Sequence, residues 1–358
     1  MNILNEWIKR LFADSQVVYL LFALVTALIT IVIFGEMLTP VIAAIVFAFL
    51  LDGGVEQLRG RGVSNLLSVA IVFIVFLTAS VIAFFTILPP IMSQFAQFFG
   101  LLPSMVGALQ EAAMKLPATY PGFVDESQII DLITRVRTEL IVIGQRALTF
   151  SLGNLTNLIT IIVYMILVPV MMFFFLKDKT EILNWLSEFL PKERPLLDQV
   201  WEEVMAKTVD YARGKVYEIL IVGFSSWMVY TFLDLRFAAF LALLTGFSVV
   251  IPYIGAALVT FPVGFVALFQ WGFGTEFLGA LIAYLIVQAI DGNLLAPLLF
   301  SEVVKLHPNA IILAILIFGG IWGIWGVFFA IPLATLSHAV IKAWSSRRNQ
   351  YFLEGPPI

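Results

Sequence analysis

The sequence predicts an all-α, polytopic integral membrane protein. Of its 358 residues, 61% are hydrophobic and only 12% are charged, whereas a soluble domain is about half apolar and about a quarter charged. Apolar runs of the length of membrane helices recur along the chain. Prolines and glycines also interrupt apolar sequence between residues 291 and 332, which is typical of irregular backbone at membrane depth. We therefore expect about eight transmembrane or re-entrant helical segments and one amphipathic helical insert outside the membrane.

The composition argues against several other classes of protein. A net charge of -4 provides no basic surface for nucleic acid. The absence of cysteine excludes disulfide bonds and thiolate metal sites. The only histidines are His307 and His338, and the sequence has neither a His-Glu-x-x-His nor a Gly-x-Ser-x-Gly motif. We expect no enzymatic activity, no cofactor and no bound metal.

The first half contains four apolar runs. The first, read as a helix of 18 residues, rises about 27 Å and crosses most of a bilayer. Pro40 lies near the start of the second run, where a missing backbone N–H is tolerated, and Pro89-Pro90 ends the third. We predict three membrane helices within residues 1–89 and a fourth after them. The runs are 17–34, 38–51, 66–88 and 155–176.

A polar insert, residues 90–154, separates the third and fourth runs. Two apolar stripes with a spacing of three to four residues predict amphipathic helices in it, although Pro103 interrupts the first. We interpret the insert as a helical cap on the membrane domain or as a ligand-binding domain. The first stripe is Phe95, Phe98, Leu102, Met105 and Leu109, and the second is Ile129, Ile133, Val136, Leu140, Ile143 and Ala147.

Residues 177–215 form a loop that is rich in positive charge. Short loops with many Lys and Arg stay cytoplasmic. This loop and both termini are therefore predicted inside, and the insert is predicted on the periplasmic side. The apolar spacing from Leu197 to Thr208 predicts an amphipathic helix on the inner surface. The cations of the loop are Lys177, Lys179, Lys192, Arg194, Lys207, Arg213 and Lys215.

The second half, residues 216–345, is predicted to be the transport core. Five apolar runs follow the cytoplasmic loop, but five full crossings would leave the basic C-terminus outside. At least one run must therefore fail to cross. The runs are 216–233, 237–251, 255–270, 277–290 and 310–341.

Two regions of this core could be re-entrant hairpins. Residues 238–269 are broken at 251–255, and residues 309–340 are broken at 319–326. Two hairpins that enter from opposite faces would make an inverted repeat, as in several transporters. One re-entrant hairpin with four ordinary spans would also leave the C-terminus inside. The glycines that would bend or pack the second break are Gly319, Gly320, Gly323 and Gly326.

The candidate binding residues lie where apolar sequence is broken. Asp291 follows an apolar run, and carboxylates in membrane segments often mark ion or proton paths. It could exchange a proton, or bind Na⁺ with Asn293 and backbone carbonyls. The Asp-Gly-Asn residues could equally form a turn or a cap, and His307-Pro308 could relay protons or start a helix. The full candidate set is Asp291, Asn293, Pro252, Tyr253, Gly255 and His307.

Short motifs follow one another through residues 213–341. They are Arg213-Gly214-Lys215, Gly246, Ile251-Pro252-Tyr253-Ile254-Gly255, Asp291-Gly292-Asn293, Pro297, Leu306-His307-Pro308, Phe318-Gly319-Gly320, Gly326 and Pro332. In their order and spacing they resemble the AI-2E family of bacterial membrane proteins, also called the autoinducer-2 exporter family. The first half matches more loosely, through Pro40 and the segment that ends at Lys177-Asp178. Many family members have Gly where this chain has Ser301.

The resemblance implies a multi-pass protein of the bacterial inner membrane that exports a small signal or exchanges Na⁺ for H⁺. It also implies homo-oligomers, pentamers among them. We predict an ion-gradient-driven secondary transporter in which Asp291, Asn293 and the carbonyls of residues 252–255 form or gate a site at mid-membrane. The other hypotheses are a cation/proton antiporter, with Asp291 as the exchanging carboxylate, and a non-transporting membrane scaffold. The expected partners are the lipid bilayer, other copies of the chain, and a small solute or cation.

Overall fold

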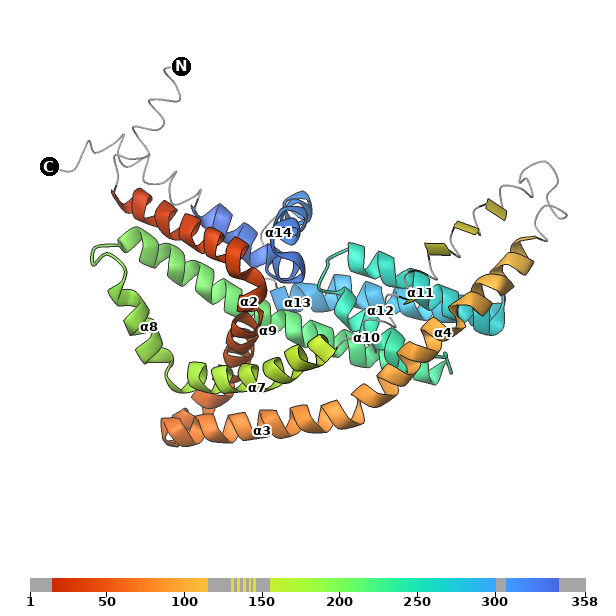
Figure 1. The fold of residues 1–358 in the computed structure, drawn as a ribbon, viewed down its shortest axis with the longest axis horizontal. Helices are drawn as coiled ribbons and strands as arrows, with labels where there is room; N and C mark the ends of the chain where they lie inside the picture. Colours follow the sequence, from red (N-terminus) through yellow and green to blue (C-terminus); the bar gives the residue numbers. More distant parts are fainter. Residues whose placement is uncertain are drawn as a thin grey trace, which may run out of the picture. The chain divides into compact units, whose positions relative to one another are not determined.

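The computed structural model describes residues 15–114, 155–300 and 307–340, together with nine residues between 130 and 145. Within these residues every regular element is a helix, and no strand is present (Figure 1). Seven described segments are long and apolar enough to cross a membrane, and two shorter apolar helices accompany them. The all-α, polytopic class predicted from the sequence is confirmed.

The first two predicted helices form a single helix, α2 (Ser15–Gly60). Pro40 lies inside it. A proline removes one backbone donor and bends a helix, but the apolar residues on both sides keep their helical hydrogen bonds. Figure 1 shows the bend in α2. α2 therefore carries both predicted runs within one bent helix, and Val18–Gly35 and Met37–Gly60 are separate candidate membrane spans in it.

The next two helices meet at the predicted break. α3 (Asn65–Thr86) ends just before α4 (Leu88–Ala113) begins. Pro89 and Pro90 occupy the first turn of α4, where backbone N–H groups have no helical partner. Pro103 lies inside α4 and does not end it, so the predicted interruption of the first stripe is wrong.

Three helices cover the middle of the chain. α7 (Leu155–Lys177) coincides with the fourth predicted run. α8 (Lys179–Glu188) follows after a single residue. α9 (Pro195–Phe232) joins the predicted inner-surface helix to the run at 216–233 without a break.

The second half consists of two helix pairs and a helical segment between them. The first pair is α10 with α11. The second pair begins with the first arm of α14; after a bend, the second arm of α14 and the helix that follows it form the other member. The segment between the pairs runs without interruption through α12, the π-helical turn η1 and α13. The bounds are α10 (Ala238–Ser248), α11 (Ile254–Trp271), α12 (Thr275–Ile290), η1 (Asp291–Leu295), α13 (Ala296–Phe300), α14 (Pro308–Phe328) and the last helix (Ala330–Val340).

The chain divides into two compact units. The first takes its described residues from Met1–Val75, Tyr164–Tyr217 and Ala296–Ile358, and the second from Phe76–Val163 and Glu218–Leu295. Each unit therefore draws helices from both halves of the sequence. This division differs from the predicted order of membrane part, insert and transport core.

α4 belongs to the core of the second unit. Phe98, Leu102 and Met105 of its predicted stripe are buried together with Tyr230 of α9 and Phe240 of α10. The rings of Phe98 and Phe240 lie 5.3 Å apart, measured between centroids. The first part of the predicted insert thus belongs to the hydrophobic core of this unit.

The second stripe of the insert, from Ile129 to Ala147, is made of residues outside the part of the chain that the structure describes. Described residues between them are helical, and Gly144 is one of them. A Cβ atom on Gly144 would lie 3.4 Å from the ring of Phe99 and 3.6 Å from Leu102. Gly144 therefore lies against α4.

The start of α9 packs against α2 in the first unit. Leu196 and Val200 are buried with Leu20, and Leu336 and Val340 of the last helix cover the same cluster. Protein thus covers part of the amphipathic face predicted for this stretch of α9, whereas Trp201 on that face is exposed.

Candidate functional site

The first hairpin closes through one glycine. A Cβ atom on Gly255 would lie 1.8 Å from the carbonyl oxygen of Ser248. Only glycine lets the first turn of α11 approach the last turn of α10 so closely. Tyr253, in the link, has a positive φ of 63° and an exposed side chain. The predicted break at residues 251–255 is a tight turn between two packed helices.

The carbonyl groups of this turn already accept backbone hydrogen bonds. Ile251 accepts from the N–H of Gly255 at 2.8 Å, and Pro252 accepts from the N–H of Ile254 at 2.7 Å. These bonds hold the turn closed. A cation at the same oxygens would have to share their lone pairs with these donors.

The second hairpin has the same geometry with different residues. A Cβ atom on Gly326 would lie 1.8 Å from the carbonyl oxygen of Phe318, and one on Gly319 would lie 2.8 Å from a side chain of the opposite arm. Gly323 lies at the bend with a φ of 60°, which glycine adopts readily. Gly320 has open space around its Cα. The sequence left open whether the second half contains one helix pair or two. The structure contains both pairs.

The second hairpin also packs against α2. A Cβ atom on Gly35 would lie 2.9 Å from the indole ring of Trp322. α2, α9 and this hairpin line an open pocket of about 240 Å³ in the first unit. Its lining is apolar apart from Thr208 and the indole of Trp322, so it holds no group that could bind an ion.

Asp291 begins the π-helical turn η1 directly after α12. The helix does not break at Asp-Gly-Asn as the sequence suggested, because η1 continues it with a wider spacing and α13 follows at once. Asp291 is buried, with 9% of its surface exposed. Single π-helical turns inside α-helices are rare, and they occur frequently at functional sites.

Apolar side chains lie one helical turn to either side of Asp291 along the chain. Val287 and Leu295 lie four residues before and after it, and both pack in a cluster with Val222 of α9 and Val249 at the end of α10. Residues four apart share a helix face, so Asp291 lies on the face that meets α9 and the first hairpin. A carboxylate in such a place is costly unless hydrogen bonds or opposite charges compensate it.

The same face of α12 is tied to the first hairpin two turns earlier. Tyr284 is fully buried, and its hydroxyl donates a hydrogen bond to the carbonyl of Ala256 in the first turn of α11. The turn of the hairpin and the end of α12 are thereby held together within the second unit.

Asn293 and His307 have local roles. The amide of Asn293 donates to the carbonyl of Ala289 at 2.8 Å, one turn back, so it does not cap the next helix. His307 accepts the N–H of Asn309 at Nδ1, at 3.2 Å, and is the N-cap of α14 with Pro308 at its first position. Both side chains are exposed. A helix start therefore accounts for the His-Pro pair.

Two buried charged residues of α9 are missing from the sequence candidates. Lys215 and Glu218 are each only 3% exposed. Tyr211 and Val222, one turn before and one turn after this pair, are buried as well. In the sequence, a spacing of three to four residues places these two charged residues on the same helix face as Tyr211 and Val222.

The Arg213-Gly214-Lys215 motif connects three helices of the first unit. Arg213 donates two hydrogen bonds to the carbonyl oxygen of Phe49 in α2, from Nε at 3.0 Å and from Nη2 at 2.9 Å. A Cβ atom on Gly214 would lie 2.8 Å from the ring of Phe300 in α13. Lys215 Nζ lies 4.9 Å from the centroid of that ring, within the range of a cation–π interaction.

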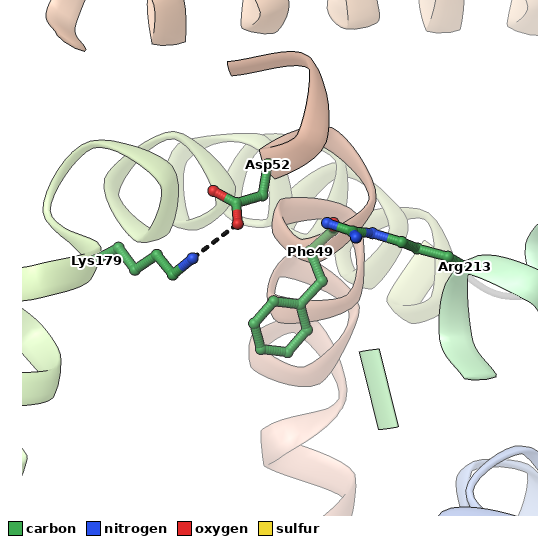
Figure 2. A network of polar contacts seen from close by, with 4 residues as sticks. All are labelled: Phe49, Asp52, Lys179 and Arg213. Atoms are coloured by element: carbon green, nitrogen blue, oxygen red, sulfur yellow. Dashed lines mark hydrogen bonds and ion pairs between the residues drawn. The ribbon is translucent and has the colours of Figure 1, made fainter. Parts of the chain in front are cut away.

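Figure 2 shows the polar contacts of this end of α2. Asp52 forms an ion pair with Lys179 of α8 at 2.7 Å, and Arg213 approaches α2 from the opposite side. Asn65, at the start of α3, donates to the carbonyl of Lys177 at 3.3 Å. The start of α3 and the end of α7 therefore lie at the same end of the first unit.

Comparisons with known proteins place this architecture among transport proteins. A model for AI-2E family transporters matches residues 20–346. The chain is 44% identical to PerM of Escherichia coli (strain K12) over 344 residues, which cover 96% of this chain and 98% of PerM. It is 26% identical to YueF of Bacillus subtilis (strain 168) over 322 residues, which cover 88% of this chain and 85% of YueF. The names of these relatives class them as a permease and a transport protein.

A more distant relative from Thermotoga maritima is 24% identical over 334 residues, which cover 91% of this chain and 94% of that protein. Its name also classes it as a transport protein. The family match extends over the described helices from α2 to the last helix and thus includes both hairpins and the π-helical turn. The chain belongs to the AI-2E family of transporters.

Proposed function

We propose that the protein is a secondary transporter of the bacterial inner membrane that uses an ion gradient to export a small solute. The observation that carries this proposal is the buried carboxylate of Asp291 at the π-helical turn. Intramembrane carboxylates are expensive and commonly belong to ion or proton pathways. Membership of a transporter family supports the transport role and argues against a non-transporting scaffold.

In this proposal the hairpins move as bodies and expose the region of Asp291 to each side of the membrane in turn. The base of the first hairpin suits such a motion. Gln270 accepts the backbone N–H of Arg236 at 2.7 Å and donates to the carbonyl of Asp234 at 2.7 Å. Because one side chain joins the entry and the exit of the hairpin, α10 and α11 would swing together.

Asp291→Asn tests the proposal, and Glu276→Gln is the matched control. The asparagine keeps the size of the side chain and removes the titratable charge, whereas Glu276 is an exposed carboxylate in the first turn of the same helix segment. We expect Asp291→Asn to fold and assemble normally but to lose transport, or its pH dependence, in proteoliposomes between about pH 6 and about pH 8. The control should transport as the wild type does.

Normal flux through Asp291→Asn at every pH would reject the role of this carboxylate. If the variant fails to fold, Asp291→Glu, which keeps the charge, decides between the two readings. A folded Asp291→Glu with shifted pH dependence supports transport chemistry. A failure of both variants to fold shows that the residue is structural.

Cation/proton antiport is the second candidate, and a second buried carboxylate in the same unit favours it. Glu218 lies one turn before Val222, which packs in the cluster around the position of Asp291. Lys215 lies one turn earlier on the same face of α9. Antiport predicts Na⁺-dependent proton movement without an organic substrate, and this movement should be lost in Glu218→Gln and kept in Glu276→Gln.

A further inference from the structure

Helix α8 has one apolar and one polar face. At about 100° per residue, Ile182, Trp185, Leu186 and Phe189 fall on one side, and the opposite side carries polar residues. The polar residues are Thr180, Glu181, Asn184, Ser187 and Glu188. The apolar face is not covered within the first unit, because Trp185 is 57% exposed and Phe189 is 72% exposed.

The position of α8 along the chain determines its depth relative to a membrane. It begins one residue after α7, whose segment Thr160–Lys177 is a candidate membrane span. Its first residue, Lys179, pairs with Asp52 at 2.7 Å. The ten residues of α8 rise only about 15 Å, half of what a crossing requires. α8 therefore starts at the polar end of a span and cannot itself be a span.

The far end of α8 is fixed as well. Arg194 donates from Nη1 to the carbonyl of Ser187 at 3.0 Å and from Nε to Asp198 at 2.9 Å. The same side chain thus joins the last turn of α8 to the first turn of α9. With both ends tied, α8 cannot turn its apolar face toward the protein without breaking one of these contacts.

We propose that α8 is an interfacial helix that lies in the boundary between the lipid headgroups and the acyl chains. Trp185 is at the centre of the exposed apolar face, and its ring meets that of Phe189 edge-on at 4.9 Å between centroids. Tryptophan favours this boundary because its body is apolar and its N–H is polar. An amphipathic helix of this kind inserts its apolar face by about 5–10 Å and leaves its polar face in water.

The absence of native cysteine allows a direct test with single spin labels. Leu186→Cys and Asn184→Cys place labels on opposite faces of α8, and Phe189→Cys with Thr180→Cys form a second opposed pair. Trp185 stays in place in every variant. The measurement is the collision rate of each label with oxygen and with a water-soluble nickel chelate, in proteoliposomes of phosphatidylcholine and phosphatidylglycerol.

We expect high oxygen and low nickel accessibility for labels at residues 186 and 189, and the reverse at residues 184 and 180. High nickel accessibility at all four positions would overturn the proposal and leave the face open to water. Shielding from both reagents, with dipolar broadening that disappears on dilution with unlabelled protein, would also overturn it. That result would identify a second copy of the chain as the occupant of the face.

Discussion

The carbonyl oxygen of Ser248 lies 1.8 Å from where a Cβ atom on Gly255 would have to be. A methyl group at this position would collide with backbone, which cannot rotate away as a side chain can. The two helices of the first hairpin can therefore meet only with glycine at residue 255.

We expect Gly255→Ala to destabilise the protein by about 3 kcal/mol or more, at the upper end of the usual cost of overpacking. Gly264→Ala in the same helix is the control, since a Cβ atom there meets nothing within 4 Å. That change should leave the free energy of unfolding unchanged or raise it by about 0.5–1 kcal/mol, because alanine favours helix. The midpoint of unfolding in detergent, followed by tryptophan fluorescence, gives the comparison. Equal midpoints for the two variants would contradict the close contact.

The second hairpin allows the same experiment with its own control. Gly326→Ala would place a methyl group 1.8 Å from the carbonyl oxygen of Phe318, whereas Gly320→Ala meets no atom within 4 Å. We expect the first variant to lose stability by about 3 kcal/mol or more and the second to fold as the wild type does. A stable Gly326→Ala protein would mean that the two arms of α14 do not approach each other as described.

The contact between Arg213 and Phe49 predicts that lysine cannot replace arginine at residue 213. Lysine carries a point charge and lacks the planar pair of donors that reaches one carbonyl oxygen twice. We expect Arg213→Lys to lower the free energy of unfolding by about 1–2 kcal/mol. Arg236→Lys, at an exposed position, should change it by less than about 0.5 kcal/mol. Chemical unfolding in mixed micelles measures both, and a result in which Arg236→Lys is the more harmful would refute the assignment.

The topology of the chain is open to labelling with single cysteines. We predict that the loop with α8 is cytoplasmic and that α4 leads to the periplasmic side, because Lys and Arg concentrate in residues 177–215. Ser104→Cys should react with a membrane-impermeant maleimide in intact spheroplasts, and Ser187→Cys should react only after lysis. Glu181→Cys, on an exposed position of α8, serves as a second inner probe. The opposite pattern of reactivity would invert the orientation.

We also predict that the protein is a homo-oligomer. α3 and the first part of α2 expose many large apolar side chains, among them Phe22, Met37 and Phe85, and lipid alone need not cover them all. Native mass spectrometry after release from nanodiscs reports the number of chains. A monomer as the sole species in nanodiscs and in several mild detergents would show that lipid does cover these faces.

Much of the architecture was visible in the sequence because its causes are local. Pro252 and Gly255 in the first break and the four glycines of residues 319–326 in the second all disfavour a straight helix, and both places became hairpin turns. Pro40 was placed near the start of a second helix, but a single missing donor does not by itself end a helix. In α2 the helix continues through Pro40 between two apolar segments, and it bends instead of ending.

The candidate site was less predictable because packing decides it. The Asp291-Gly-Asn sequence favours a turn by itself, yet the packing of Val287 and Leu295 into one cluster keeps the backbone helical as a π turn. Glu218 stands near the start of an apolar run, where charge is usually exposed, and only the neighbouring helices bury it. Helical spacing identifies the face of such a residue, but the sequence does not say which face is covered.

The bend in α2 has a consequence for the thickness of the membrane that suits this protein. A straight helix of 46 residues would be about 69 Å long, more than twice the hydrocarbon layer of about 30 Å. Protein contacts hold both ends of α2, since α9 and the last helix bury Leu20 while Arg213 and Lys179 contact the other end. A thicker or thinner bilayer would therefore change the tilt of α2 about Pro40 before it exposed either end.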